Sequence, residues 1–269
     1  MSVNTVRAYY DDGVPYEWSR LEERCIPEFH ITKRYLERYI HAGDRVLDMG
    51  GGPGRYALWL AERGCEVTLA DLSPNNAAFA AEEAARRGLP LRTFCADART
   101  PDMLADELFD HVLLMGPLYH LTEEIDRLQA VRANLALLHP GGTFFAAFIN
   151  SYAGVWDYCA KYPELILNSD THCFFELLTE DKPFCGNSFT EFCFIRPTDI
   201  APFMAQFPLI QQHLVNCEAF LALRKKEFST LPQEIQIAWL EVAEKVCERE
   251  DLLSMAEHFL YIGIKEDIK

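Results

Sequence analysis

Three glycines at alternate positions are the residues whose type and spacing most plainly fit a ligand. Gly50, Gly52 and Gly54 follow a short apolar stretch that includes Leu47, which we expect to end a buried strand. A turn this tight favours glycine, because glycine adopts positive φ and has no Cβ. The apolar residues after the turn recur at helical spacing, which predicts a helix over residues 55–64. Strand, glycine turn and helix together form a site where backbone N–H groups approach a nucleotide-type ligand.

An acid before the first glycine indicates the kind of ligand. The nicotinamide fingerprint is G-x-G-x-x-G, whereas here Arg55 takes the place of its third glycine and Asp48 precedes the turn. A carboxylate at a strand end suits a cation or an ammonium group better than a pyrophosphate. S-adenosylmethionine (SAM) has a sulfonium and an amino group and no phosphate. At these residues the chain resembles the class I SAM-dependent methyltransferases, whose first motif is an acid followed by G-x-G-x-G.

Two further acids follow predicted strands. Asp71 lies about twenty residues past the glycines, where an acid can accept both ribose hydroxyls, although an acid in a solvated loop is the alternative. By the resemblance, Asp97 lies near the adenine, Met115 near the sulfonium, and Tyr10 near the cofactor, unless Tyr10 is a surface aromatic. The predicted cofactor-binding residues are Tyr10, Asp48, Gly50, Gly51, Gly52, Gly54, Asp71, Leu72, Asp97, Ala98 and Met115.

The acceptor side of the site has weaker signals. Methyl transfer needs alignment and exclusion of water, and it needs a base only if the acceptor loses a proton. His120 is the candidate base, because imidazole titrates near neutral pH; a histidine that caps the next helix is the alternative. The residues predicted to line an acceptor pocket, with core packing as the alternative for the aromatics, are Arg20, His30, Tyr119, Tyr152, Trp156 and His172. We expect no metal, because Met115 is not a ligand for a hard cation.

Strands alternate with helices up to residue 149, which predicts a doubly wound α/β fold with a mostly parallel sheet. The family resemblance implies a Rossmann-like sheet of seven strands with the last one antiparallel. A turn is expected at residues 140–142 and a strand with its flanks at residues 209–223. The predicted segments are an N-terminal helical lid (1–44), a SAM-binding core (45–149), a substrate-covering insertion (150–197) and a C-terminal completion of the sheet with helices (198–269).

Composition narrows the classes of function. The 269 residues carry a formal net charge of −16, which repels phosphate backbones and disfavours a nucleic-acid partner. No window reaches the roughly eighteen apolar residues of a membrane span, and no signal peptide is recognisable. Nine cysteines are scattered without a C-x-x-C pair, which argues against a zinc site and against a disulfide framework. Reduced thiols and a cytoplasmic location are therefore expected.

These observations predict an enzyme that moves a methyl group from SAM to O, N or S of a small molecule by direct displacement, as a monomer or homodimer. Two alternatives remain open. A protein or peptide methyltransferase would need an open acidic groove for a basic partner. A SAM-binding sensor without catalysis would keep the cofactor residues and block the path to the methyl group.

Overall fold

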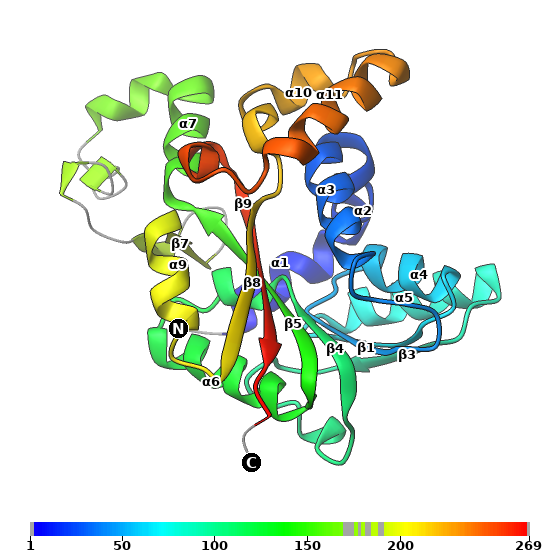
Figure 1. The fold of residues 1–269 in the computed structure, drawn as a ribbon. Coiled ribbons are helices and arrows are strands. Elements are labelled where there is room, and N and C mark those ends of the chain that lie inside the picture. The colour runs from blue at the N-terminus through cyan, green and yellow to red at the C-terminus, as the bar shows by residue number, and fades with distance from the viewer. Residues whose placement is uncertain (1–2, 169–174, 177–178, 181–183, 188–190, 268–269) are drawn as a thin grey trace.

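A mixed β-sheet forms the centre of the computed structural model, which describes residues 3–168, 175–176, 179–180, 184–187 and 191–267 (Figure 1). Its first five strands run parallel in the order β3-β2-β1-β4-β5. They are β1 (Arg45–Met49), β2 (Glu66–Asp71), β3 (Leu91–Cys95), β4 (Phe109–Leu114) and β5 (Leu138–Asn150). The carboxyl ends of these strands share one edge of the sheet, where ligands bind in open α/β folds.

The C-terminal part of the chain completes the sheet. β9 (His258–Lys265) pairs antiparallel with β5, and β8 (Leu209–Asn216) pairs antiparallel with β9. This confirms the predicted doubly wound sheet of seven strands with an antiparallel last strand. The sheet of the described residues has nine strands, because the segment after β5 adds a hairpin of β6 (Phe184–Asn187) and β7 (Glu191–Ile195).

Helices cover both faces of the sheet. Those of the N-terminal segment are α1 (Val3–Asp12), α2 (Val14–Ser19), the π-helix η1 (Arg20–Arg24) and α3 (Ile26–Leu36). Those between the parallel strands are α4 (Arg55–Glu62), α5 (Pro74–Arg87), η2 (Asp102–Leu104), η3 (Pro117–Tyr119) and α6 (Glu124–Ala136). The remaining ones are α7 (Ser151–Lys161), η4 (Pro163–Leu167), α9 (Pro197–Met204), η6 (Ala219–Arg224), α10 (Lys225–Phe228), α11 (Gln233–Val246) and η7 (Glu250–Met255). Figure 1 shows α3 beside α11, so a helix of the N-terminal segment packs against one of the C-terminal part of the chain.

Alternation along the strands creates one hydrophobic core on each face. In β1, Val46 packs into the core beneath α3, α4 and α11, whereas Leu47 and Met49 pack into the core beneath α6 and α9. In β5, Phe145 packs into the first of these cores and Phe144 into the second. Successive side chains of a strand point to opposite faces, and strands covered on both faces read as continuous apolar runs. The sheet therefore holds the strand ends of the site rigidly.

Two predicted boundaries are wrong. Residues 140–142 do not form a separate turn but lie within β5, where the pairing with β4 shifts register between Phe109 and His111. The glycines are absorbed as an irregularity in the strand, and Gly141 has a φ of +77°. The strand expected over 209–223 ends at Asn216, because the chain turns into η6 through Ala219, which has a positive φ of 52°.

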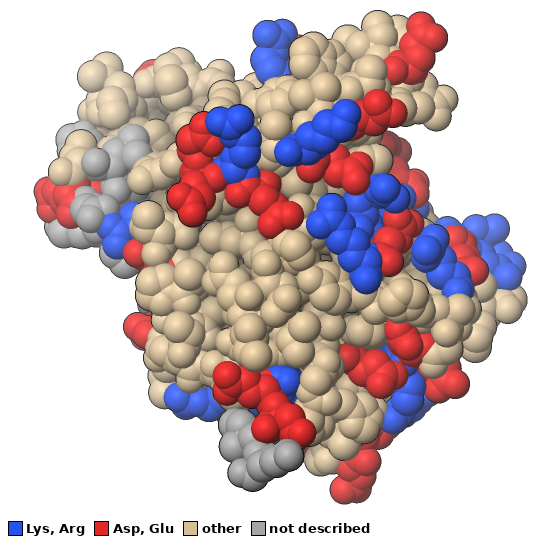
Figure 2. Space-filling view, viewed as in Figure 1, with Lys and Arg blue, Asp and Glu red and all other residues tan. Residues whose placement is uncertain are grey.

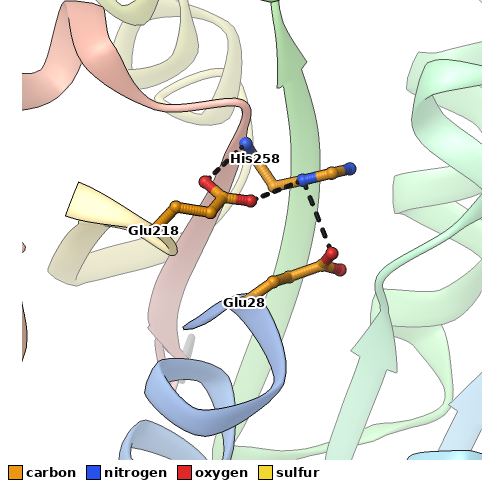
Figure 3. Close-up of side chains that lie close together, drawn as sticks. All are labelled: Glu28, Glu218 and His258. Carbon is orange, nitrogen blue, oxygen red and sulfur yellow. Dashed lines mark hydrogen bonds and ion pairs between the residues drawn. The ribbon is translucent and has the colours of Figure 1, made fainter. Parts of the chain in front are cut away.

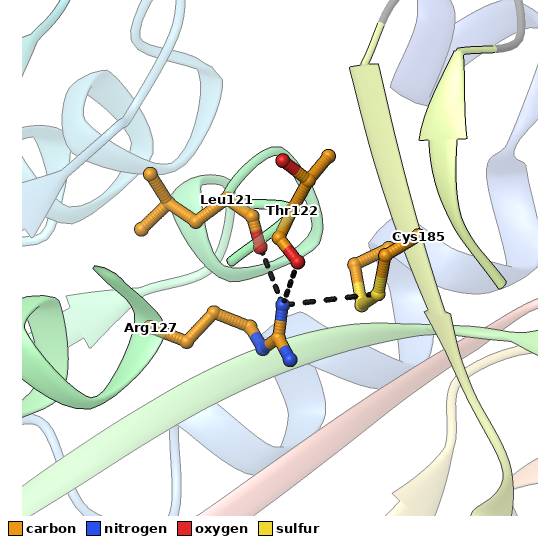
Figure 4. The surroundings of a disulfide bond; sticks show 5 residues. Leu121, Thr122, Arg127 and Cys185 are labelled. Atoms are coloured by element: carbon orange, nitrogen blue, oxygen red, sulfur yellow. Dashed lines mark hydrogen bonds between the residues drawn. A yellow bond between two sulfur atoms is a disulfide. The ribbon is translucent and has the colours of Figure 1, made fainter. Parts of the chain in front are cut away.

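A disulfide contradicts the expectation of reduced thiols alone. Cys185 and Cys193 lie opposite each other in the β6–β7 hairpin and are joined by a disulfide (Figure 4). The sequence pattern missed the pair because seven residues separate the two cysteines and only hairpin pairing brings them together. Arg127 Nη1 lies 3.8 Å from Cys185 Sγ and donates to the carbonyl oxygens of Leu121 and Thr122 at 2.6 and 2.9 Å. The hairpin thereby lies against the loop after η3.

The surface mixes charges of both signs. Figure 2 shows Lys and Arg side chains interspersed with Asp and Glu on the face in view. Arg87, for example, pairs with Glu62 at 2.7 Å and with Glu83 at 2.6 Å. Within the described residues, the helices all fall short of the length and apolar character needed to cross a membrane.

Candidate functional site

A cavity of about 700 Å³ opens at the carboxyl ends of β1, β2 and β4. Its walls come from the glycine turn, from the strand ends, from the N-terminal helices, from the start of β9 and from the β6–β7 hairpin. Most of the predicted cofactor residues line it: Tyr10, Asp48, Gly50, Gly51, Gly52, Asp71, Leu72, Asp97, Ala98 and Met115. The cavity is of the size and mixed polarity typical of small-molecule sites.

The glycine turn lies directly against the segment that follows β4. Gly50 has a φ of +75°, and a Cβ there would lie 2.5 Å from Pro117 Cδ. A Cβ on Gly116 would lie 2.8 Å from the Gly50 carbonyl oxygen. Gly54 does not line the cavity; it is the N-cap of α4, and a Cβ there would lie 3.0 Å from Ala80 Cβ. The third glycine thus serves helix packing, while the first two shape the wall.

Asp48 is a buried acid beneath the turn. Its side chain is 1% exposed, and its Oδ2 has no hydrogen-bond partner among the described residues. Burial, together with the charge of Asp71, raises the pKa of Asp48 to about 7. A buried carboxylate oxygen without a donor is costly. The site is therefore suited to a ligand that brings an N–H group or a positive charge.

Asp71 ties the end of β2 to the glycine turn. Its Oδ2 accepts from the backbone N–H of Gly52 at 2.8 Å, and its Oδ1 accepts from the N–H of Ser73 at 2.8 Å and from Asn76 Nδ2 at 3.2 Å. Ser73 also caps α5 as predicted, accepting from the N–H of Asn76. Burial raises the pKa of Asp71, and these hydrogen bonds oppose that shift. The sequence argument missed Asn76, which also lines the cavity.

Asp97 is held by an arginine next to it. Arg99 Nη2 donates to Asp97 Oδ2 at 2.7 Å, and Arg99 Nη1 donates to Asp126 Oδ2 at 2.8 Å. Although burial opposes it, the bonds to Arg99 lower the pKa of Asp97, so its carboxylate is ionised. All three residues line the cavity. Arg99 and Asp126 were not predicted, and Arg99 fixes the direction of the Asp97 side chain.

Tyr10 and His120 form a hydrogen-bonded pair inside the cavity. Tyr10 Oη lies 2.6 Å from His120 Nε2, and His120 Nδ1 lies 3.0 Å from the backbone oxygen of Glu191 in the hairpin. A carbonyl oxygen only accepts, so Nδ1 carries the ring proton and Nε2 accepts from the tyrosine. Burial lowers the pKa of His120 to about 4, so the imidazole is neutral. Any proton that reaches His120 Nε2 must pass through Tyr10.

The N-terminal helices are fastened over the cavity at two points. Ser73 Oγ donates to Asp11 Oδ1 at 2.5 Å, which docks α1 on the start of α5. Arg55 stacks on Trp18, with its guanidinium carbon 3.5 Å from the ring centroid, and pairs with Glu22 at 3.0 Å. The arginine in the third-glycine place therefore connects α4 to the N-terminal segment.

A buried ion-pair network lines the far end of the cavity. Glu28 Oε2 accepts from Arg20 Nη1 at 2.7 Å and lies 3.6 Å from His258 Nδ1. His258 Nδ1 also lies 2.7 Å from Glu218 Oε1 (Figure 3). Arg20 was predicted as a pocket residue; Glu28 and His258 were not. Their separation along the chain leaves no local signal, because only the fold brings α3, the segment after β8 and the start of β9 together.

The geometry of this cluster is that of an ion pair and not of ligands around a metal ion. The atoms that bind a metal ion lie about 2.0–2.2 Å from it, and each directs a lone pair at the ion. Here Glu218 Oε2 accepts from the N–H groups of Glu257 and His258 at 3.1 and 3.0 Å, and Oε1 bonds the imidazole directly. Arg20 donates to both carboxylate oxygens of Glu28. A cation would have to displace these donors.

Three predicted pocket residues lie elsewhere. His30 lies 3.5 Å from Glu244 of α11, because its side chain leaves α3 on the side away from the cavity. Tyr152 and Trp156 lie on α7 and do not line the cavity; the hairpin residues Cys185 and Glu191 do. His172 lies outside the described residues. Tyr119, predicted with them, lines the cavity and donates to the Met115 carbonyl at 3.1 Å.

The doubly wound sheet with a cavity at the ends of β1, β2 and β4 defines the class of Rossmann-like cofactor-binding folds. A family model described as a methyltransferase domain matches residues 46–142. A ubiquinone biosynthesis O-methyltransferase from Stutzerimonas stutzeri is 30% identical over 172 residues, 61% of this chain and 72% of that protein. One from Methylocella silvestris is 39% identical over 152 residues, 55% of this chain and 54% of that protein.

A solved structure extends the likeness to the whole fold. The 1,6-didemethyltoxoflavin-N1-methyltransferase of Burkholderia thailandensis, solved with 1,6-didemethyltoxoflavin and S-adenosylhomocysteine (SAH), aligns with a TM-score of 0.61 and 15% identity, covering 98% of this chain and 88% of that chain. The chain belongs to the class I SAM-dependent methyltransferases. It spans about half the length of several of the curated relatives it matches.

Proposed function

We propose that this chain transfers a methyl group from SAM to O, N or S of a small molecule, and that the cavity holds both reactants. The observation that carries the proposal is a single cavity lined by two chemically different groups of residues. One group is the glycine turn with Asp48 and Asp71; the other includes Arg20, Glu28 and His258 of the ion-pair network. The N-terminal helices act as a lid over both. In this proposal the chain is cytoplasmic and a monomer or homodimer, and it uses neither nucleic acid nor a membrane.

The residues present fit SAM. The unpartnered Oδ2 of Asp48 would accept from the amino group of the cofactor, directly or through water. The Gly50–Gly116 contact leaves no room for a Cβ, so the backbone itself forms the wall. Asp71 already accepts three hydrogen bonds and has about one lone pair left for a ribose hydroxyl. In this proposal Asp97 and Ala98 contact the adenine ring. Gly51, Gly52, Leu72, Met115 and Tyr10 complete this wall in the proposal.

Catalysis by the chain consists of alignment and desolvation. Bound SAM supplies an electrophilic methyl group on a sulfonium. Closure of α1 and α2 over the cavity excludes water, and the buried side chains orient the acceptor toward Met115 and Tyr119. Where the acceptor must lose a proton, Tyr10 Oη takes it while the tyrosine proton moves to His120 Nε2, which is free to accept because its other nitrogen is protonated. His120 thus receives the proton through Tyr10, as a weak base, because burial lowers its pKa to about 4.

The affinity for SAH should depend on pH through Asp48. Because the pKa of this acid is raised to about 7, the carboxyl is increasingly neutral below that pH and cannot balance an ammonium group. We expect calorimetry to give about tenfold weaker SAH binding at about pH 6 than at about pH 8. Asp48→Asn should remove the dependence while leaving weaker binding. An unchanged slope in that variant would show that another group titrates.

Arg55 should control closure of the lid. Arg55→Ala removes the stack on Trp18 and the pair with Glu22, together worth about 1–2 kcal/mol. We expect faster proteolytic cleavage within residues 3–24 and about tenfold weaker SAH binding, with an unchanged melting temperature for the core. Arg86→Ala is the matched control, because Arg86 is exposed and its partner among the described residues is Glu83 on its own helix. Equal cleavage rates for the two variants would argue against a lid held by Arg55.

The proposed reaction is tested with SAM labelled on its methyl group and a panel of small acceptors bearing hydroxyl, amine and thiol groups. Mass spectrometry should detect a labelled product from at least one class, together with SAH, and Asp71→Asn should lower the yield of both by up to about a hundredfold at subsaturating SAM. Binding of SAM without turnover on any acceptor class, including small basic peptides, would favour the sensor alternative. Turnover only on a peptide or protein would favour the alternative of a protein or peptide methyltransferase.

A further inference from the structure

The two ring nitrogens of His258 differ in their surroundings. Its Nδ1 is taken by Glu218 at 2.7 Å and faces Glu28 at 3.6 Å. Figure 3 shows both carboxylates on that side of the ring, with Nε2 directed away from them. Within the part of the chain that the structure describes, Nε2 makes no hydrogen bond to protein, and His258 lines the cavity. The atom that this residue offers to a ligand is therefore Nε2.

The imidazole ring of His258 is positively charged at neutral pH. Burial alone would lower the pKa of His258, but Glu28, Glu218 and Glu257 raise it to about 9. These groups face it from α3, from the segment after β8 and from the residue just before β9, and Lys225 of α10 pairs with Glu257 at 2.6 Å. An imidazolium has protons on both nitrogens, so Nε2 is a charged donor.

The carboxylates of the cluster are not available to a ligand in the same way. Glu28 accepts from Arg20 through both oxygens, at 2.7 and 3.3 Å. Glu218 accepts from the imidazole and from two backbone N–H groups. Both acids serve to hold cations in place, and Glu17, which also lines the cavity, pairs with Arg20 at 3.2 Å. Among the described atoms of the Glu28–Glu218–His258 cluster, the one directed at the cavity without a protein partner is a donor, His258 Nε2, which favours a ligand oxygen with negative charge.

We propose that His258 binds an anionic oxygen of the methyl acceptor through Nε2–H, so that the substrate class is an organic acid, a carboxylic acid or a phenol bound as its anion. This inference rests on the function proposed above and names the substrate class of that same cavity. Glu218 and Glu28 are positioning residues, which hold the ring and keep it charged. Arg20 of η1 pairs with Glu28 at 2.7 Å and adds a second positive charge beside His258.

The test uses three probes of one shape and different charge, namely benzoate, benzamide and benzylamine, each titrated into the protein saturated with SAH. Benzoate should bind about tenfold more tightly than the neutral and the cationic probe, since a charge-assisted hydrogen bond replaces a neutral one. His258→Gln should abolish this preference and leave SAH binding intact. His213→Gln is the matched control, because His213 forms a similar pair with Glu248 at 2.8 Å outside the cavity.

A second readout separates binding from folding. The ring signal of His258, assigned by its loss in His258→Gln, should shift in the NMR spectrum on addition of millimolar benzoate and not of benzylamine. Glu218→Gln should lower the pKa of His258 and make the benzoate preference fade as the pH rises toward neutrality, with recovery at lower pH. A ring signal that ignores benzoate, an equal response to the three probes, or a preference for benzylamine overturns the inference. Failure of SAH itself to bind folded protein would instead overturn the proposed function.

Discussion

Gly50→Ala should reduce SAH affinity by about a hundredfold or more, the largest effect we expect from the addition of one methyl group to this chain. The new Cβ would lie 2.5 Å from Pro117 Cδ and 2.6 Å from its Cγ, and the backbone φ of +75° is disfavoured for alanine. Relief of the overlap must move the turn or the segment after β4. Both form the cavity wall, so the change acts directly on the ligand.

The control for Gly50→Ala is Gly88→Ala. Gly88 has a similar φ of +69°, but a Cβ there meets nothing within 4 Å, and the residue caps α5 away from the cavity. This variant should lose about 1 kcal/mol of unfolding free energy from backbone strain and bind SAH normally. Calorimetry and thermal unfolding of both variants separate strain from overlap. Wild-type affinity in Gly50→Ala would mean that the ligand does not contact this turn.

Asp71→Asn should weaken SAH binding by about a hundredfold, because the charged acceptor for a ribose hydroxyl is lost and the glycine turn that this carboxylate holds is disturbed. The amide also places a donor against the N–H groups of Gly52 or Ser73, which now bond the carboxylate at 2.8 Å. A modest loss of stability is expected with it. The affinity is measured by calorimetry at equal folded fraction.

Asp157→Asn provides the comparison for Asp71→Asn. Asp157 is an exposed acid on α7 that pairs with Lys161 at 2.6 Å and lies outside the cavity lining. Its loss should leave both affinity and melting temperature unchanged. If Asp71→Asn bound SAH like Asp157→Asn, the acid at the end of β2 would hold only the glycine turn and not the ribose.

Local patterns predicted most of the residues that line the cavity beside the glycine turn. The glycine turn, the acids after β2 and β3, and the Ser73 cap depend on short stretches whose backbone requirements are visible in the residue types themselves. Alternation of strands and helices then places these stretches at one edge of the sheet. Gly54 was assigned to the ligand because spacing alone does not separate a wall residue from one that permits close helix packing.

The other half of the cavity depends on contacts between distant segments. Glu28, Glu218 and His258 converge only after the N-terminal helices and β9 are in place. Tyr152 and Trp156 were chosen for their aromatic side chains, but aromatic content does not say which face of α7 is turned toward a ligand. Cys185 and Cys193 pair through the register of the hairpin, and the weak periodicity of this segment does not predict a hairpin. Non-local pairing, and not residue type, decides these features.

Titration of the unmodified chain with SAH in a calorimeter, checked for folding by circular dichroism, tests the central claim most directly. The claim is that the cavity beside Gly50, Asp48 and Asp71 is a SAM site. It predicts saturable binding with one site per chain and micromolar affinity, about −8 kcal/mol, which is competed by SAM. Folded protein that gives no saturable heat with either ligand would contradict the account.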